Sequence, residues 1–438
     1  MNEYKYIYVL GIGGSGMSSI SKYLSQKGLE VKGYDQRRSF ITNQLEQDGI
    51  KVEFNLENIE YSKDTLYIYS SAIQIEKTIF SKYLKNKNVI SRPQFLNKLS
   101  KENKIIGVTG THGKTSTTAL LSHIFHYNNI NVSYIYGGMT SFHGIGGHYG
   151  DENNPLILET DEAFNTFKDI EIDDLLVTNI DKDHLDYFLS YDNLIEAFKH
   201  VISNVKDNLV LNFDDQILNE IKINNKYLSY ASEDVADFKI IYPDKFKFED
   251  KEYKIVSNLI GSHFVSNIVG AIALAYLNGI EIKDSLLAIK SFPGVKRRTE
   301  YLGSVGGIDV YDDYGHHPTE LKATIESLKE HSKGKLYVVF QPHRYTRTKN
   351  SFDDFKKQLS KSDYSIVVDI YPAGEIPIPG ISSKNFEMKN VKYLKSMRMV
   401  PSYLSTRIKE NDTVLTLGAG DITLLGPQIL KYLDEKKN

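Results

Sequence analysis

Short apolar runs alternate along this chain with stretches in which apolar residues recur every three or four positions. The first run, "YKYIYVL", ends at a glycine-rich turn, and Met17, Ile20 and Leu24 then share one side of a helix expected over Ser15–Lys27. A short apolar run bounded by glycine is typical of a buried strand, and the wider spacing is typical of a helix packed on one face. The N-terminal pattern therefore predicts a strand, a turn and a helix.

The same order continues to the C-terminus. Because helices separate the apolar runs, we expect the strands to pair in parallel, in doubly wound α/β sheets with alternating strands and helices throughout. One helix is predicted in "HFVSNIVGAIALAYLNG", ending at its glycine, and another begins at Pro318, which suits a first helical turn. The other predicted strands are "LEVKGYD", "TLYIYSSAI", "IIGVT", "PLILET" (155–160), "DLLVTNI" (174–180), "GIDVYDD", "KLYVVFQPH", "YSIVVDIYPA" and "DTVLTLGAGD".

Two breaks in this pattern divide the chain. The charged stretch "KLSKENK" precedes a second strand–glycine loop–helix unit, and "SFPGVKRRTEYLG" (291–303) carries Pro293 and Gly294, which suit a hinge. A chain of 438 residues is also longer than one ordinary core supports. We therefore expect three α/β domains, at residues 1–100, 101–294 and 295–438.

Composition narrows the class of protein. A net charge of −3 and 41% hydrophobic residues describe a globular protein, and the scattered, balanced basic residues argue against a nucleic-acid partner. No apolar stretch approaches the roughly 18 residues that span a bilayer, so we expect no membrane insertion and a cytoplasmic location. The absence of cysteine excludes disulfides, thiolate metal sites and a cysteine nucleophile.

The glycine-rich turn Gly-Ile-Gly-Gly-Ser-Gly occupies residues 11–16. Its spacing, with Asp35 about 20 residues later, is that of a dinucleotide-binding turn, which presents backbone N–H groups and a helix N-terminus to a diphosphate. Taken alone, this fingerprint leaves NAD, FAD or another diphosphate as its ligand.

A second loop, Thr-Gly-Thr-His-Gly-Lys-Thr at 109–115, gives a stronger signal. It is a shortened phosphate loop, because Val108 stands where the standard pattern has glycine. Lys114 suits the β- and γ-phosphates of ATP, and the Thr115 hydroxyl suits Mg²⁺. The alternative is an ordinary glycine turn with a solvent-facing lysine, which the flanking strand and helix disfavour.

Acidic residues follow two predicted strands of the same unit. Glu159, Asp161 and Glu162 follow the first, and Asp181, Asp183, His184 and Asp186 follow the second. Ligands collect at the carboxyl ends of strands in open α/β sheets, so these residues are candidate Mg²⁺ ligands. On pattern alone, each acid is equally a solvated loop residue.

The last unit contains "YDDYGHHPTE" and "QPHRYTRT". Arg344 and Arg347 lie three residues apart, so a helical or turn backbone would point both at one anion. Arginines bind carboxylates in a bidentate manner, so a carboxylate is the expected ligand. A solvated basic turn is the alternative.

Taken in order, these motifs resemble one family, the Mur ligases of peptidoglycan synthesis. The resemblance covers essentially the full length and is carried by "GIGGSGMSSI", "SSAI", "GTHGKT", "ETDE", "TNIDKDHLDYF", "DDYGHHPTE", "QPHRYTRT", "YPAGEIPIPGISS" and "LGAGDI". The "DDYGHHPTE" and "QPHRYTRT" motifs favour the members that use L-alanine over the other Mur ligases and over the related ligase that recycles murein tripeptide.

The resemblance implies a Rossmann-like N-terminal domain for a UDP-linked substrate, a central P-loop-type ATPase domain with a parallel-rich sheet, and a Rossmann-like C-terminal domain. It implies ATP and Mg²⁺ as cofactors and UDP-N-acetylmuramate and L-alanine as substrates. In the implied reaction, ATP phosphorylates the lactyl carboxylate, and the alanine amine attacks the acyl phosphate to give an amide, ADP and phosphate. With an ATP loop at 109–115, the first glycine loop is better assigned to the UDP group than to NAD.

The resemblance also implies roles for single residues. The implied catalytic residues are Lys114, Glu159, His184 and Arg298, and the implied metal ligands are Thr115, Glu159 and His184. ATP is expected at Gly110, Thr111, His112, Gly113, Lys114, Thr115, Ser116, Asn267, Arg298 and Asp313. The UDP substrate is expected at Gly11, Gly13, Gly14, Ser15, Gly16, Asp35, Ser70 and Ser71, and the amino acid at His316, Arg344 and Arg347.

Three positions depart from the family pattern. Phe264 replaces the first asparagine of the usual His-Asn-x-x-Asn, Thr299 replaces a phenylalanine, and Ala163–Phe164 replace Ser-Asp. Phe264 would either stack on adenine or weaken ATP binding, but the metal and phosphate residues are intact, so we expect activity. The rival hypotheses are a nucleotide-binding regulatory relative without turnover and an NAD-dependent oxidoreductase, which leaves the loop at 109–115 and the arginine pair unexplained.

Overall fold

The computed structural model describes residues 4–140, 144–233 and 235–436. The chain forms two compact units: one combines the chain up to Ser257 with Val265–Pro293, and the other combines Asn258–Phe264 with Gly294–Asn438. Among the described residues, no helix is both long and apolar enough to cross a membrane.

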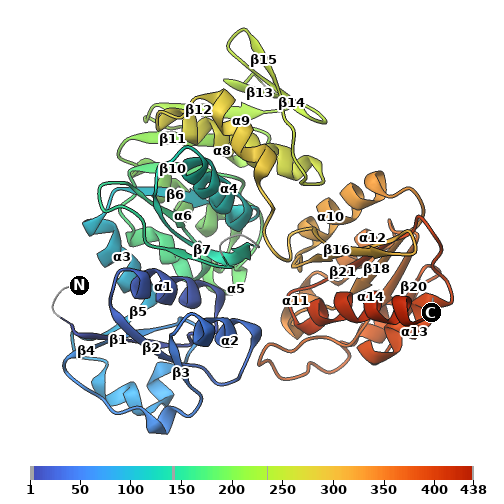
Figure 1. Ribbon diagram of the computed structural model, residues 1–438, viewed down its shortest axis with the longest axis horizontal. Helices are drawn as coiled ribbons and strands as arrows, with labels where there is room; N and C mark the ends of the chain where they lie inside the picture. Colours follow the sequence, from blue (N-terminus) through green and yellow to red (C-terminus); the bar gives the residue numbers. More distant parts are fainter. Residues whose placement is uncertain (1–3, 141–143, 234, 437–438) are drawn as a thin grey trace. The chain divides into compact units, whose positions relative to one another are not determined.

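The N-terminal sheet has five strands in the order β3-β2-β1-β4-β5, all parallel. The predicted strand–turn–helix start is confirmed, since β1 leads through the glycine-rich turn into α1 (Figure 1). The order reverses at β1, and ligands bind at such a switch point in doubly wound sheets. The elements are β1 (Tyr6–Leu10), α1 (Ser15–Gln26), β2 (Glu30–Tyr34), α2 (Phe40–Gln47), β3 (Lys51–Glu53), β4 (Thr65–Tyr69), β5 (Val89–Ser91) and α3 (Arg92–Glu102).

The central sheet has ten strands in the order β15-β14-β13-β12-β11-β10-β6-β9-β7-β8. Its middle is parallel as predicted, but β7–β8 and β13–β14–β15 pair antiparallel, so the expectation of alternating strands and helices throughout was wrong here. The strands are β6 (Ile105–Thr109), β7 (Ser133–Thr140), β8 (Gly144–His148), β9 (Leu156–Glu159), β10 (Asp174–Val177), β11 (Asn208–Asn212), β12 (Tyr227–Ala231), β13 (Phe238–Ile241), β14 (Lys245–Phe248) and β15 (Lys251–Lys254).

Helices flank this sheet, and α4 packs against β7 and β9. The predicted "HFVSNIVGAIALAYLNG" helix is α8, and the glycine after it, Gly279, has a φ of 85° that suits a helix end. The helices are α4 (Lys114–Tyr127), α5 (Leu185–Phe188), α6 (Tyr191–Ser203), α7 (Gln216–Glu220), α8 (Ser262–Leu277) and α9 (Ile282–Ser291).

The N-terminal and central sheets share a core. One apolar cluster runs from Ile7 and Ile20 to Leu175 and Leu211, and α1 packs on the β7–β8 hairpin (Figure 1). The Ser19 hydroxyl on α1 donates to the Tyr136 carbonyl of β7 at 2.7 Å. These two sheets therefore form one packed body.

The second compact unit holds a six-stranded sheet in the order β16-β17-β21-β18-β19-β20. Only β16 runs antiparallel to its neighbour. The helix predicted to begin at Pro318 does so, with His317 as its N-cap. The elements are β16 (Glu300–Val305), β17 (Ile308–Asp313), α10 (Pro318–His331), β18 (Leu336–Phe340), α11 (Tyr345–Asn350), α12 (Phe352–Leu359), β19 (Tyr364–Val367), β20 (Val391–Tyr393), α13 (Val400–Ser405), β21 (Thr413–Leu417) and α14 (Leu425–Glu435).

Candidate active site

The phosphate loop joins the end of β6 to the start of α4. Gly110 has a φ of 133° and Gly113 a φ of 82°, a backbone region that side chains rarely adopt. A Cβ at Gly110 would overlap the Thr178 hydroxyl, and one at Gly113 would lie 2.8 Å from the amide oxygen of Asn267. The loop therefore requires glycine at both positions, and the buried Asn267 side chain lies directly against it.

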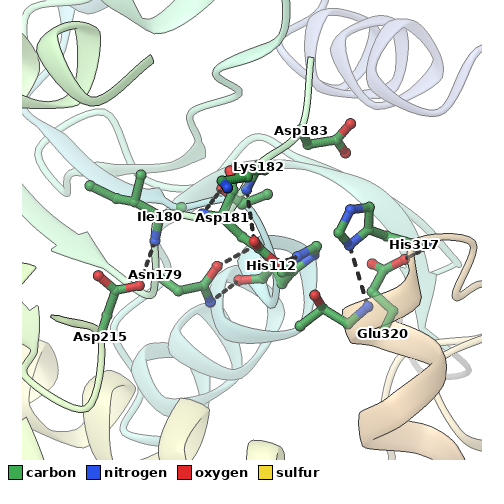
Figure 2. Close-up of polar contacts among 12 residues, drawn as sticks. His112, Asn179, Ile180, Asp181, Lys182, Asp183, Asp215, His317 and Glu320 are labelled. Carbon is green, nitrogen blue, oxygen red and sulfur yellow. Dashed lines mark hydrogen bonds and ion pairs between the residues drawn. The ribbon is translucent and has the colours of Figure 1, made fainter. Parts of the chain in front are cut away.

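The segment after β10 holds this loop in shape, as Figure 2 shows. The His112 N–H donates to the Asn179 side chain at 2.8 Å, and the His112 ring lies 3.0 Å from the Asp181 carboxylate. The Asp181 N–H donates to the Thr111 hydroxyl at 2.9 Å. Asp215 in turn accepts the Ile180 N–H at 2.9 Å. Asp181, one of the acids that follow β10, therefore stabilises the conformation of the phosphate loop.

The Lys114 ammonium is buried among oxygen acceptors. It donates to a Glu162 carboxylate oxygen at 2.8 Å and to the carbonyls of Gly110 and Thr111 at 2.6 and 3.0 Å. Burial alone would lower the pKa of Lys114, but Glu162 and Asp161 outweigh it and raise that pKa above its usual value. Burial raises the pKa of Glu162 to about 7, even with Lys114 opposite.

Oxygen donors suited to a divalent cation lie beside the loop. The Thr115 hydroxyl donates to Glu159 at 2.9 Å, and the second Glu159 oxygen accepts the Gly137 N–H at 2.5 Å. His184 is grouped with Asp161 and Glu162, since their ligand atoms lie within 4.8 Å of one another. The buried Oε1 of Glu162 has no hydrogen-bond partner among the described residues. A buried carboxylate oxygen without a partner, grouped with the Asp161 carboxylate, fits a Mg²⁺ ion.

The glycine-rich turn is shaped by two of its predicted companions. The Gly13 N–H donates to Asp35 at 2.8 Å, so Asp35 ties the turn to the end of β2. A Cβ at Gly11 would lie 3.0 Å from that of Ser70. Gly14 is the N-cap residue of α1, whose first residues are Ser15 and Gly16. Ser71 is exposed in the loop that follows β4.

Arg92, which the sequence analysis did not single out, lies against this turn. A Cβ at Gly16 would lie 3.1 Å from the Arg92 guanidinium, and Arg92 is 3.8 Å from the Asp161 carboxylate. Its Nε is buried without a hydrogen-bond partner in the described part of the chain. A Cβ at Gly137 would lie 3.4 Å from both Ser15 and Glu159. The glycine-rich turn and the phosphate loop therefore share one wall.

In the second compact unit, Asp313 and Arg298 lie in one buried network. Asp313 accepts N–H bonds from Thr299 at 2.6 Å and Gly315 at 2.7 Å. Burial raises the pKa of Asp313 to about 6, against the opposing charge of Arg298. Arg298 lies 3.5 Å from Glu320, which also accepts the His317 N–H at 3.1 Å (Figure 2). Arg298 and Asp313 thus belong to the segments around "DDYGHHPTE".

The "DDYGHHPTE" and "QPHRYTRT" motifs of this unit lie next to each other. The His316 ring lies 5.7 Å from the His343 ring, which stacks on Tyr371 at 5.6 Å. Arg344 is the N-cap residue of α11 and has a φ of 69°, and Arg347 lies within that helix. Burial, together with His316, Arg347 and Arg344, lowers the pKa of His343 to about 3. His343 is therefore neutral among positively charged neighbours.

Comparison with known families assigns all three sheets. The model of the "Mur ligase family, catalytic domain" matches residues 6–104, that of the "Mur ligase middle domain" matches 108–275, and that of the "Mur ligase, glutamate ligase domain" matches 297–420. The chain belongs to the Mur ligase family.

Two relatives that match it over nearly the full length are named UDP-N-acetylmuramate–L-alanine ligases. The one from Desulforamulus reducens is 33% identical over 99% of this chain and 98% of the relative. The one from Geotalea daltonii is 34% identical over 98% of each chain. The crystal structure of the UDP-N-acetylmuramate–alanine ligase of Thermotoga maritima has the same fold, with a TM-score of 0.82, 24% identity and coverage of 98% and 99% of the two chains.

Proposed function

We propose that this protein joins L-alanine to the lactyl carboxylate of UDP-N-acetylmuramate and converts ATP to ADP and phosphate in the process. The observation that carries the proposal is the shared wall of Ser15, Gly137 and Glu159, which brings a diphosphate-binding turn beside a phosphate loop. A ligase needs this arrangement, because its carboxylate substrate must meet the γ-phosphate. An NAD-dependent oxidoreductase has no use for the second loop.

The chemistry is mainly positioning and charge neutralisation. A carboxylate does not react with an amine at neutral pH, so it is first converted into an acyl phosphate, whose phosphate the alanine amine then displaces. When bound, ATP and Mg²⁺ would supply the phosphoryl group and the positive charge that neutralises it. Lys114 would bind the phosphates, and Thr115, Glu159 and His184 would hold the cation.

The remaining residues would bind the three substrates. Gly11–Gly16 would hold the UDP diphosphate, with Asp35, Ser70 and Ser71 around it, and Asn267 would face the adenine side of ATP. From the C-terminal sheet, Arg298 and Asp313 would contact ATP, and His316, Arg344 and Arg347 would surround L-alanine, the arginines facing its carboxylate. We assign these roles to three domains, at residues 1–100, 101–294 and 295–438.

Phosphate release with UDP-N-acetylmuramate, ATP, Mg²⁺ and L-alanine tests the proposal. We expect release that depends on alanine; purified protein that releases no phosphate above the level without alanine would contradict the ligase function. Lys114→Ala should abolish release and leave binding of UDP-N-acetylmuramate, measured by calorimetry, nearly unchanged. The exposed Lys199→Ala is the control and should behave as the wild type. If Lys114→Ala loses affinity for the UDP substrate, the two loops do not bind ATP and the UDP group separately as proposed.

A further inference from the structure

The motif "YPAGEIPIPGISS" has no role in the function proposed above, yet its glutamate contacts the predicted amino-acid site. Glu375 lies in the loop after β19, and its side chain is only 17% exposed. One carboxylate oxygen accepts Nε–H of Arg344 at 2.6 Å. Arg344 is the residue to which we assign the carboxylate of L-alanine, so Glu375 touches that arginine directly.

Glu375 also holds the backbone that carries Arg344. Its two oxygens accept the Thr346 hydroxyl at 2.6 Å and the Thr346 N–H at 3.0 Å. The Arg344 N–H donates to the Tyr371 carbonyl at 2.9 Å, four residues before Glu375. Arg344 has a φ of 69°, a conformation that a non-glycine residue keeps only where its surroundings impose it. The "YPAGE" loop therefore fixes the backbone conformation of the "HRYT" turn through these hydrogen bonds.

The contact also shows how Glu375 orients the Arg344 guanidinium. A carboxylate engages arginine in a bidentate manner either along the Nε edge or across the two terminal amino groups. Glu375 accepts from Nε, so it engages the guanidinium along the Nε edge. The three hydrogen bonds to Glu375 come from Arg344 and Thr346, so its contacts are those of a residue that orients the arginine.

We propose that Glu375 is a positioning residue for the amino-acid substrate, which acts by fixing the orientation of Arg344. This proposal rests on the function proposed above, because it needs Arg344 to bind the alanine carboxylate. It makes the "YPAGE" loop part of the amino-acid site. It also predicts that the loop controls the affinity for alanine without contacting the reacting atoms.

The test is a double-mutant cycle with steady-state kinetics. We expect Glu375→Ala to raise the KM for L-alanine by about tenfold, since charge-assisted hydrogen bonds carry effects of this size, and to change kcat at saturating alanine by less than about twofold. Glu375→Gln should show a smaller rise. In the Arg344→Ala background, Glu375→Ala should add nothing, because it acts through that arginine.

Controls separate this role from general damage. The KM for ATP and for UDP-N-acetylmuramate, and the thermal midpoint, should stay close to the wild type in Glu375→Gln. Glu387→Gln removes a surface carboxylate that pairs with Lys392 of β20, and it should change none of these constants. An unchanged KM for alanine in both Glu375 variants, or fully additive effects with Arg344→Ala, would overturn the proposal. If the wild type itself releases no phosphate in response to alanine, the proposed function fails instead.

Discussion

A buried ammonium such as that of Lys114 stays charged only where protein groups supply the hydrogen bonds that water would otherwise make. Two carbonyls and the Glu162 carboxylate accept its three N–H bonds, so the charge is both neutralised and fully hydrogen-bonded. Of these three acceptors, Glu162 is the one that carries a carboxylate to offset the positive charge. Glu162 thus holds Lys114 at the loop.

His343 contrasts with Lys114, because burial lowers its pKa and leaves the ring neutral. The unfolded chain takes up a proton on this histidine near pH 6.5, whereas in the folded protein its pKa is lowered to about 3. The unfolded state therefore binds more protons as the pH falls, and the C-terminal sheet should lose stability below pH 6.5. Between pH 7 and pH 5 we expect wild type to lose about 1 to 2 kcal/mol more than His343→Gln in urea unfolding. Equal losses in the two proteins would show that His343 is protonated when folded.

At this scale, the sequence predicts groups with a chemical signature of their own. Lys114 and Thr115 stand in a loop whose spacing defines their chemistry, and Glu159 lies at the end of a strand beside it. Their partners carry no such signature. Glu162 was one acid among several candidate ligands, and only the folded chain shows that it pairs with Lys114. Arg92 and Glu375 contact residues far away in the sequence, so only the folded chain identifies these two.

Single elements show where the apolar pattern is informative. Strands such as β6 and β10 were predicted because they are buried on both faces and read as continuous apolar runs. Other parallel strands, such as β11 and β12, were missed. The β7–β8 hairpin was missed, because glycines interrupt it and leave no alternating pattern. Those glycines have a purpose of their own, since they allow α1 to approach the hairpin closely.

Gly147 on β8 provides the test of that approach. A Cβ there would overlap the Ser19 carbonyl of α1, and backbone atoms cannot move aside as a side-chain tip does. We expect Gly147→Ala to destabilise the first compact unit by about 1 to 3 kcal/mol and to weaken binding of UDP-N-acetylmuramate. Urea unfolding and calorimetry measure the two effects.

Gly107→Ala is the matched control for this variant. Its added Cβ would meet only side-chain carbons of Leu175 and Ile172, at 3.1 and 3.2 Å. It should therefore be the milder substitution. If Gly147→Ala is as stable as the wild type, the close packing of α1 on β8 is not required.

On the scale of the whole molecule, the chain forms three sheets that are largely parallel. The N-terminal and central sheets share a core, and Arg92 on α3 reaches from the glycine-rich turn to Asp161 of the central sheet. Its guanidinium adds positive charge where the UDP-linked substrate would pass from one sheet to the other. Periodicity predicted the three sheets, but it cannot show which of them pack together, because that depends on side chains far apart in the sequence.

Arg92→Ala should therefore weaken binding of UDP-N-acetylmuramate by about tenfold in calorimetry and leave ATP binding unchanged. UDP-N-acetylglucosamine, which lacks the lactyl carboxylate, separates the two anions of the substrate. An equal loss for both ligands points to the diphosphate, and a loss for UDP-N-acetylmuramate alone points to the lactyl group. Arg38→Ala, at an exposed arginine paired with Glu46, is the control. Wild-type affinity in Arg92→Ala would remove this residue from the site.

The edge strand β15 of the central sheet carries charged residues that oppose the addition of a further strand. β15 is the last strand in the order, and an unpaired strand edge is a template on which other chains can polymerise. Here the edge carries Lys251, Glu252 and Lys254, and Glu252 pairs with Lys245 of β14 at 2.7 Å. Charged residues of this kind repel a second copy in the same register. The hairpin that lengthens the sheet therefore also protects the protein from edge-to-edge aggregation in a crowded solution.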